Sequence, residues 1–249
     1  MATRLPQLLV TKKNIEDSVE NKPNLLTLTV DITNNNAVKK AIDETVTTFG
    51  RIDVVVNNAG YMLLGSLEEV SAEEYHQSAS VNIYAFLNVI RNAMPHFRKQ
   101  KSGHVFNFSS SAGYGGEGYA GSYNSAKSAV IGFSETLAQE VKPFNVKVTI
   151  VSPGYFRTSF LEKGAFAIAG NKVEGYITNE LVALMNQMNG NQYGDPDKLV
   201  AALVNISEEE NPPLHLLMGK DAYERASNYY QTRLSEFEKW KVVSTSTDL

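Results

Sequence analysis

The feature that most constrains the fold is a repeated alternation of short apolar runs with longer amphipathic stretches. The apolar runs read as strands, and more than ten residues separate each from the next. Such spacing requires crossover connections, which place neighbouring strands parallel. The sequence therefore predicts an α/β fold with a doubly wound, mostly parallel sheet, whose strands are residues 25–30, 52–56, 104–108, 146–151 and 214–218.

The stretches between these runs have the periodicity and end signals of helices. Ser71 precedes Glu73 and Glu74, a typical helix start. The pattern predicts helices at residues 34–49, 71–97, 122–141, 195–207 and 221–240. Residues 155–193 break the alternation and are expected to form a substrate lid beyond a strand end. With no repeat or linker, residues 1–249 are predicted to form a single domain.

Composition excludes several classes of function. The chain has no cysteine, which removes disulfides, thiolate catalysis and zinc–thiolate sites. Its four histidines are scattered, so no metal site is predicted. A net charge of −4 with mixed signs disfavours general nucleic-acid binding. No run of 18 apolar residues or secretory signal is present, so we expect a cytoplasmic protein without a membrane span.

Tyr123 and Lys127 are the first candidates for chemistry. They lie four positions apart, so on a helix they share a face. An ammonium group beside a phenol favours the phenolate, and it is expected to lower the phenol pKa toward the working pH. Such a phenol can donate a proton to a carbonyl or accept one from an alcohol. A tyrosine and lysine at this spacing also occur by chance, so their context decides.

That context is a series of markers at the ends of predicted strands. Residues 57–60 read Asn-Asn-Ala-Gly after the strand at 52–56, and Ser110 follows the strand at 104–108. Pro153 and Gly154 follow the strand at 146–151. With Tyr123 and Lys127 in this order, the chain resembles the short-chain dehydrogenase/reductase family, in its classical type. The resemblance runs from about residue 2 to the C-terminus and implies a Rossmann-like fold.

The resemblance implies four catalytic roles. Tyr123 would be the general acid/base, and Lys127 would lower its pKa and hold the nicotinamide ribose. Ser110 would hydrogen-bond the substrate oxygen, and Asn82 would hold a water that relays protons through Lys127. Taken singly, Ser110 could simply precede a helix and Asn82 could be an ordinary helical residue.

The resemblance also implies a cofactor site at the strand ends. Asp31 would accept a hydrogen bond from the adenine, although it could equally begin the next helix. Arg4 lies where the family often places a basic residue for the 2′-phosphate of NADP, which favours NADP and leaves NAD possible. The implied cofactor-binding residues are Arg4, Asp31, Asn58, Ala59, Gly60, Tyr123, Lys127, Pro153, Gly154 and Thr158.

One family motif is absent from the sequence. The glycine-rich turn Thr-Gly-x-x-x-Gly-x-Gly, which holds the cofactor pyrophosphate, does not occur. We therefore expect an N-terminally truncated fold without its first strand and first helix, which would leave the strand at 52–56 with an open edge. The sequence could be incomplete, the chain could repack or borrow a strand from a second copy, or it could be a degenerate member.

The expected function is an NADP-preferring oxidoreductase that interconverts a ketone or aldehyde with an alcohol. Its alternative is a non-catalytic binding or regulatory protein on the same scaffold. The resemblance implies a homodimer or homotetramer, with no nucleic-acid or membrane partner. Six residues suggest a mainly apolar substrate pocket, or else ordinary core: Met62, Leu63, Leu64, Phe156, Phe160 and Leu161.

Overall fold

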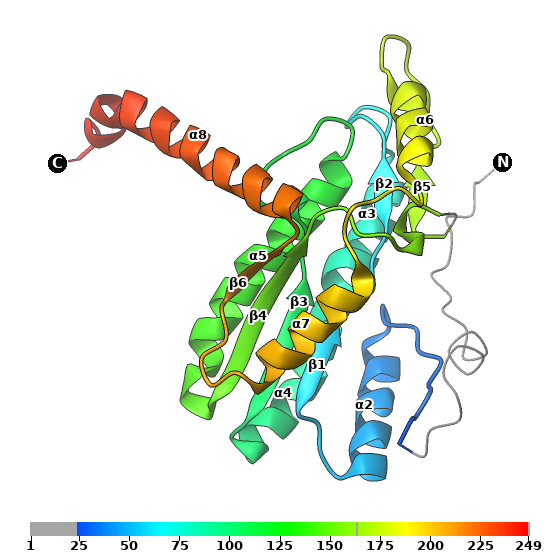
Figure 1. The fold of residues 1–249 in the computed structure, drawn as a ribbon, viewed down its shortest axis with the longest axis vertical. Coiled ribbons are helices and arrows are strands. Elements are labelled where there is room, and N and C mark those ends of the chain that lie inside the picture. Colours follow the sequence, from blue (N-terminus) through cyan, green and yellow to red (C-terminus); the bar gives the residue numbers. More distant parts are fainter. Residues whose placement is uncertain (1–23, 163, 249) are drawn as a thin grey trace.

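The computed structural model describes residues 24–162 and 164–248, and its centre is a parallel four-stranded sheet (Figure 1). The strands are β1 (Val54–Asn57), β3 (Gly103–Phe108), β4 (Val146–Pro153) and β6 (His215–Met218). Their order across the sheet is β1-β3-β4-β6, and every neighbouring pair is parallel. This confirms the predicted doubly wound α/β class.

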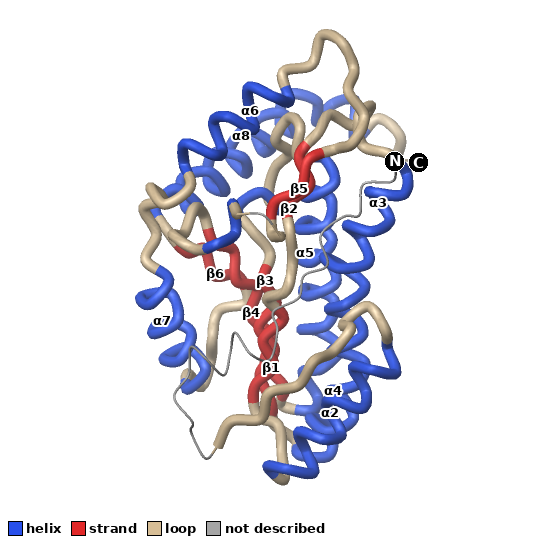
Figure 2. The backbone as a smooth tube through the Cα atoms, turned by 90° about the vertical axis from the view of Figure 1, so that its right-hand side faces the viewer, coloured by secondary structure: helices blue, strands red, loops and turns tan. Residues whose placement is uncertain are grey.

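Helices cover both faces of this sheet (Figure 2). One face carries α4 (Ala85–Gln100) and α5 (Gly121–Val141), with α2 (Asn35–Phe49) packed on α4, and the other carries α7 (Pro196–Glu208). Because the central strands β3 and β4 are covered on both sides, nearly all of their residues are buried. The main core lies between the strands and the helices α4 and α5, and it contains Ile52, Ile90, Ala93, Phe97, Val105, Leu137, Val141, Val146 and Val148.

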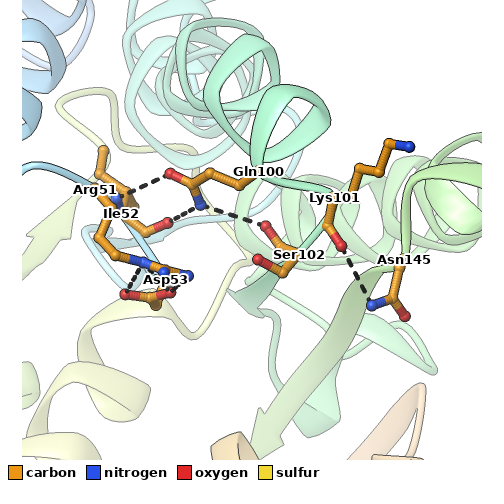
Figure 3. Close-up of polar contacts among 7 residues, drawn as sticks. All are labelled: Arg51, Ile52, Asp53, Gln100, Lys101, Ser102 and Asn145. Atoms are coloured by element: carbon orange, nitrogen blue, oxygen red, sulfur yellow. Dashed lines mark hydrogen bonds and ion pairs between the residues drawn. The ribbon is translucent and has the colours of Figure 1, made fainter.

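The amino ends of the strands are fixed by polar contacts of the adjoining turns (Figure 3). The Gln100 side chain accepts a hydrogen bond from the Ile52 N–H at 3.3 Å and donates one to the Ile52 carbonyl at 2.6 Å. The Asn145 amide donates to the Lys101 carbonyl at 3.3 Å. These contacts tie the start of β1 to the end of α4, and the turn before β4 to the turn before β3. Fixing this end of the sheet aligns the carboxyl ends at the opposite edge.

The predicted strand at residues 25–30 is wrong, since these residues form no strand. An extended apolar sequence becomes a strand only where it joins a ladder of backbone hydrogen bonds, and none of the described strands pairs with this segment. Within the described residues β1 is therefore the edge of the sheet, and its Val54 and Val56 are 41% and 53% exposed.

The predicted helix at 71–97 is interrupted near its middle. Ser71 caps α3 (Ala72–Ala79) and forms the expected capping box with Glu74. A π-helical turn, Ser80–Tyr84, then connects α3 to α4. The extra residue in such a turn breaks the regular hydrogen-bond ladder and commonly marks a functional site.

Residues 155–193, the predicted lid, contain regular structure that the sequence pattern did not predict. A short strand β5 (Phe166–Ile168) pairs in parallel with β2 (Met62–Leu64), and α6 (Thr178–Met188) follows. The last helix, α8 (Lys220–Thr245), extends five residues beyond its predicted end at residue 240. None of the described helices is long and apolar enough to cross a membrane.

Candidate active site

The chemistry-bearing residues meet at the carboxyl ends of the strands. Ser110 follows β3 in an extended conformation, and its hydroxyl accepts a hydrogen bond from the Ala112 N–H at 3.2 Å. Tyr123 lies in the first turn of α5, which begins shortly after, and Lys127 lies one turn further on. Ser110 is within hydrogen-bonding reach of the Tyr123 hydroxyl. The structure therefore brings together the three residues that the sequence singled out.

Lys127 is a buried lysine held by the backbone of β3. Its side chain is almost entirely enclosed, and Nζ donates to the Phe108 carbonyl at 2.9 Å. The same nitrogen lies 5.6 Å from the centroid of the Tyr123 ring and 5.5 Å from that of Phe86. The Ser109 hydroxyl donates to the Lys127 carbonyl at 2.8 Å, which ties the end of β3 to the helix backbone. The position of the ammonium group is thus set by β3 as well as by α5.

Asn82 lies in the π-helical turn and is completely buried. Its amide brackets the backbone of Tyr61, accepting from the N–H and donating to the carbonyl, each at 3.1 Å. A Cβ atom on Gly60 would lie 2.6 Å from Asn82 Oδ1 and 3.5 Å from Lys127 Nζ. Gly60, Asn82 and Lys127 therefore converge on one point, where only glycine leaves room.

Burial controls the ionisation of the pair. Desolvation raises the pKa of Tyr123 to about 12, and a hydrogen bond with Ser110 only partly opposes this. Desolvation also lowers the pKa of Lys127 to about 8. The expected lowering of the phenol pKa by Lys127 is not found, because loss of hydration outweighs the charge of an ammonium that is directed to Phe108. The phenol is consequently protonated at neutral pH and able to donate.

The predicted cofactor residues occupy different surroundings. Asn58 and Ala59 are exposed beyond β1, whereas Gly60 is half-buried against Asn82. Pro153 and Gly154 end β4, where a Cβ on Gly154 would lie 2.1 Å from a carboxylate oxygen of Asp221. These residues share the carboxyl edge of the sheet, where open α/β folds bind ligands.

The remaining predicted cofactor residues are Thr158, Asp31 and Arg4. Thr158 is exposed and caps a short 3₁₀ turn by accepting from the Phe160 N–H at 3.3 Å. Asp31 accepts hydrogen bonds from the Thr33 N–H at 3.0 Å and its hydroxyl at 2.6 Å, in the turn that leads into α2. Arg4 lies outside the described residues. Asp31 does not begin the next helix either, because Asn34 is the residue that caps α2.

An apolar wall surrounds Tyr123. The predicted pocket residues Met62, Leu64 and Phe160 do pack in this cluster, together with Leu181 and Val182 of α6. Leu63 faces a different cluster with Tyr61 and Val81. Helix α6 was not predicted, although the recurrence of Leu181, Met185 and Met188 is a helical period that could have indicated it. Glu69 was not predicted either, because nothing in its local sequence distinguishes it from a surface glutamate.

Comparisons with known proteins agree with this geometry. The family model described as short chain dehydrogenase matches residues 7–165. The chain is 32% identical to oxidoreductase BOA17 of Botryotinia fuckeliana, over 91% of this chain and 82% of that protein. It is 35% identical to the 3-ketodihydrosphingosine reductase of Bacteroides thetaiotaomicron, over 80% of this chain and 75% of that protein.

Two solved structures are also similar. A short-chain dehydrogenase from Streptomyces avermitilis superposes with a TM-score of 0.79 at 32% identity, covering 89% of this chain and 81% of that one. The protein ElxO, solved with NADP bound, superposes with a TM-score of 0.60 at 26% identity, covering 76% of this chain and 74% of that one.

Proposed function

Because this chain belongs to the short-chain dehydrogenase family, we propose that it interconverts a ketone or aldehyde with an alcohol, with Tyr123 as the general acid and base. Membership makes the chain an oxidoreductase that uses a nicotinamide cofactor. The observation that carries the proposal is the convergence of Ser110, Tyr123 and Lys127 at the carboxyl ends of the strands, beside an apolar wall.

Each of these side chains has a part in the proton transfer. In the reducing direction the Ser110 and Tyr123 hydroxyls bind the carbonyl oxygen and polarise it. Tyr123 gives its proton to that oxygen and becomes a phenolate, because burial keeps the phenol protonated until then. The Lys127 ammonium stabilises the phenolate charge through the low-dielectric interior. In the oxidising direction the same groups take the proton back.

The nicotinamide end of a cofactor fits the residues present. Gly60 lacks a Cβ, which lets the Asn82 amide lie close to its backbone, beside the Lys127 ammonium. Lys127 has three N–H donors, and the hydrogen bond to Phe108 uses one, so others can reach ribose hydroxyls. The cofactor would supply or accept the hydride. We assign the ribose contacts to Lys127 and Tyr123, and the adjoining contacts to Asn58, Ala59, Gly60, Pro153, Gly154 and Thr158.

The finer assignments extend this proposal. NADP is favoured over NAD through Arg4, with Asp31 on the adenine side, and Asn82 holds a relay water. We propose a cytoplasmic homodimer or homotetramer that pairs through α5 and the α3–α4 helix, as the family resemblance implies. The substrate class is an apolar ketone, aldehyde or alcohol, supported by the side chains around Tyr123.

One sequence observation favours a second candidate function. The chain contains no Thr-Gly-x-x-x-Gly-x-Gly turn, so a binding or regulatory protein without cofactor chemistry is the alternative. Titration of the purified protein with NADPH, followed by cofactor fluorescence, separates the two. Saturable binding supports the enzyme, whereas no binding at millimolar NADPH supports the alternative.

The assigned chemistry is tested by Tyr123→Phe, which removes only the phenolic oxygen. We expect NADPH-dependent reduction of 2-octanone to fall at least about 1,000-fold, while the thermal midpoint stays close to wild type and NADPH affinity falls by far less than turnover. Tyr223→Phe, on the exposed surface of α8, is the matched control and retains full turnover. Turnover by Tyr123→Phe within tenfold of wild type would show that the proton comes from elsewhere.

A further inference from the structure

Three carboxylates, two from the segment between β2 and α3 and one from the first turn of α3, hold the predicted lid. Glu68 accepts a hydrogen bond from the Tyr176 hydroxyl at 2.8 Å, and Glu74 accepts one from the Gly170 N–H at 2.8 Å. Between them, Glu69 accepts one from the Thr178 hydroxyl at 2.5 Å. Three acidic side chains within seven positions of one another therefore hold three points of the lid.

Glu69 makes the deepest of these contacts. Both Glu69 and Thr178 are only 1% exposed, so the carboxylate depends on protein groups to replace its hydration. It also accepts from the Ser66 N–H at 2.9 Å, and a backbone N–H of Val173 contributes a further hydrogen bond from the lid. These contacts, with Thr178 first, hold the pKa of Glu69 below its ordinary value. The charge lies beside the first residue of α6, where the helix dipole favours an anion.

The hydrogen bond between Glu69 and Thr178 also positions the apolar side chains that line the candidate active site. Thr178 begins α6, and Leu181 and Val182 follow it by three and four positions, on the same side of the helix. Both side chains pack in the cluster that contains Tyr123, Met62 and Leu64, and both remain partly exposed. Fixing Thr178 against Glu69 therefore fixes where these two side chains stand relative to the Tyr123 phenol.

We propose that Glu69 and Thr178 are positioning residues, which hold α6 so that Leu181 and Val182 bind the alkyl part of a substrate beside Tyr123. The substrate then carries an apolar chain of several carbons on its carbonyl carbon. This inference rests on the proposed function, because it names the substrate class of the same site. Its structural half, the attachment of the lid, is measurable without turnover.

The test compares Thr178→Val, which removes the hydroxyl, with Thr178→Ser, which keeps it. Losing a hydrogen bond to a charged group corresponds to roughly a tenfold effect or more. We expect the KM for 2-octanone to rise roughly tenfold in Thr178→Val, with kcat within about twofold, and the KM for acetone to change by less than about twofold. Thr178→Ser restores wild-type values for both ketones.

Limited digestion with trypsin reads the lid directly. Lys172 is exposed in the lid between the points held by Glu74 and Glu69, and mass spectrometry identifies cleavage after it. Cleavage is expected to be roughly tenfold faster in Thr178→Val than in wild type. Tyr176→Phe is the matched control: it removes only the exposed contact to Glu68, and we expect less than a twofold change in both measurements.

The possible results distinguish the positioning role of Glu69 and Thr178 from the assignment of Leu181 and Val182 to the alkyl chain. Unchanged cleavage in Thr178→Val overturns the positioning role. Faster cleavage with an equal KM change for both ketones overturns the assignment of Leu181 and Val182 to the alkyl chain. If the wild-type protein binds no NADPH and reduces neither ketone, the proposed function fails, whereas faster cleavage of Thr178→Val still supports the attachment of α6 by Glu69.

Discussion

Lys127 is predicted to lower the stability of the fold that it serves. Its side chain is 3% exposed, and burial lowers its pKa from 10.5 to about 8. Because one pKa unit is worth about 1.4 kcal/mol, the charged ammonium at pH 7 costs the folded state about 3 kcal/mol. Lys127 bears this cost although its ammonium donates a hydrogen bond to the Phe108 carbonyl, because that single bond does not replace the water lost by the ammonium.

Lys127→Met removes the charge and keeps an unbranched side chain of similar length. The variant no longer bears the desolvation cost of about 3 kcal/mol, but it leaves the Phe108 carbonyl without its donor, which costs about 1–3 kcal/mol. We therefore expect the free energy of unfolding at pH 7 to rise by about 1 kcal/mol, while reductase turnover is lost. Urea unfolding followed by circular dichroism measures the change.

The dependence on pH gives this prediction its sign. The folded pKa of Lys127 lies below the unfolded value, so the cost is complete below pH 8 and declines as the pH rises from 8 toward 10.5. Wild type should gain about 2 kcal/mol relative to Lys127→Met between pH 7 and pH 10. Lys220→Met, on the exposed surface of α8, should show no such trend. A constant difference between wild type and Lys127→Met at the two pH values would refute the reasoning.

Two further substitutions test packing and helix capping. Gly60→Ala puts a Cβ 2.6 Å from Asn82 Oδ1 and should lower the free energy of unfolding by about 1–3 kcal/mol. Gly118→Ala, whose Cβ would have nothing within 4 Å, should not lower it. Equal urea midpoints for the two variants would contradict the crowding at Gly60. Asp195→Ala removes the side chain that accepts from Asp197 and Lys198 at the start of α7, costing about 1 kcal/mol by thermal unfolding, and Asp195→Asn should retain most of that stability.

The sequence pattern predicted the central strands β3 and β4 well because nearly all of their residues are buried. Residues 104–108 were predicted as a strand, and β3 is Gly103–Phe108. The same pattern failed at residues 25–30, where the apolar alternation is present but none of the described strands pairs with the segment. It also missed β2 and β5, whose pairing joins Met62 to Phe166 across a long stretch of chain. A local sequence pattern indicates which side chains are buried, but it does not indicate which distant strand pairs with that segment.

The candidate site divides in the same way. The sequence was sufficient to predict that Tyr123 and Lys127 lie one turn apart on a helix and that Ser110 follows a strand. The pKa of Tyr123 was not, because it depends on burial by Met62, Phe160 and the lid. The hydrogen bond between Glu69 and Thr178 could not be predicted from the sequence either, since it depends on the pairing of β2 with β5.

The parallel arrangement of the sheet also has a consequence for how the chain folds. Val54 pairs with His104, His104 with Lys147, and Ile150 with His215, so each strand pair closes a loop of roughly 40–65 residues. None of these pairs can start as a local hairpin, and such distant contacts make folding slow. On a growing chain, β1, β3 and β4 can assemble before β6 exists. Until β6 arrives, the outer edge of β4 is open, and the late steps of synthesis are therefore when this protein is most exposed to aggregation.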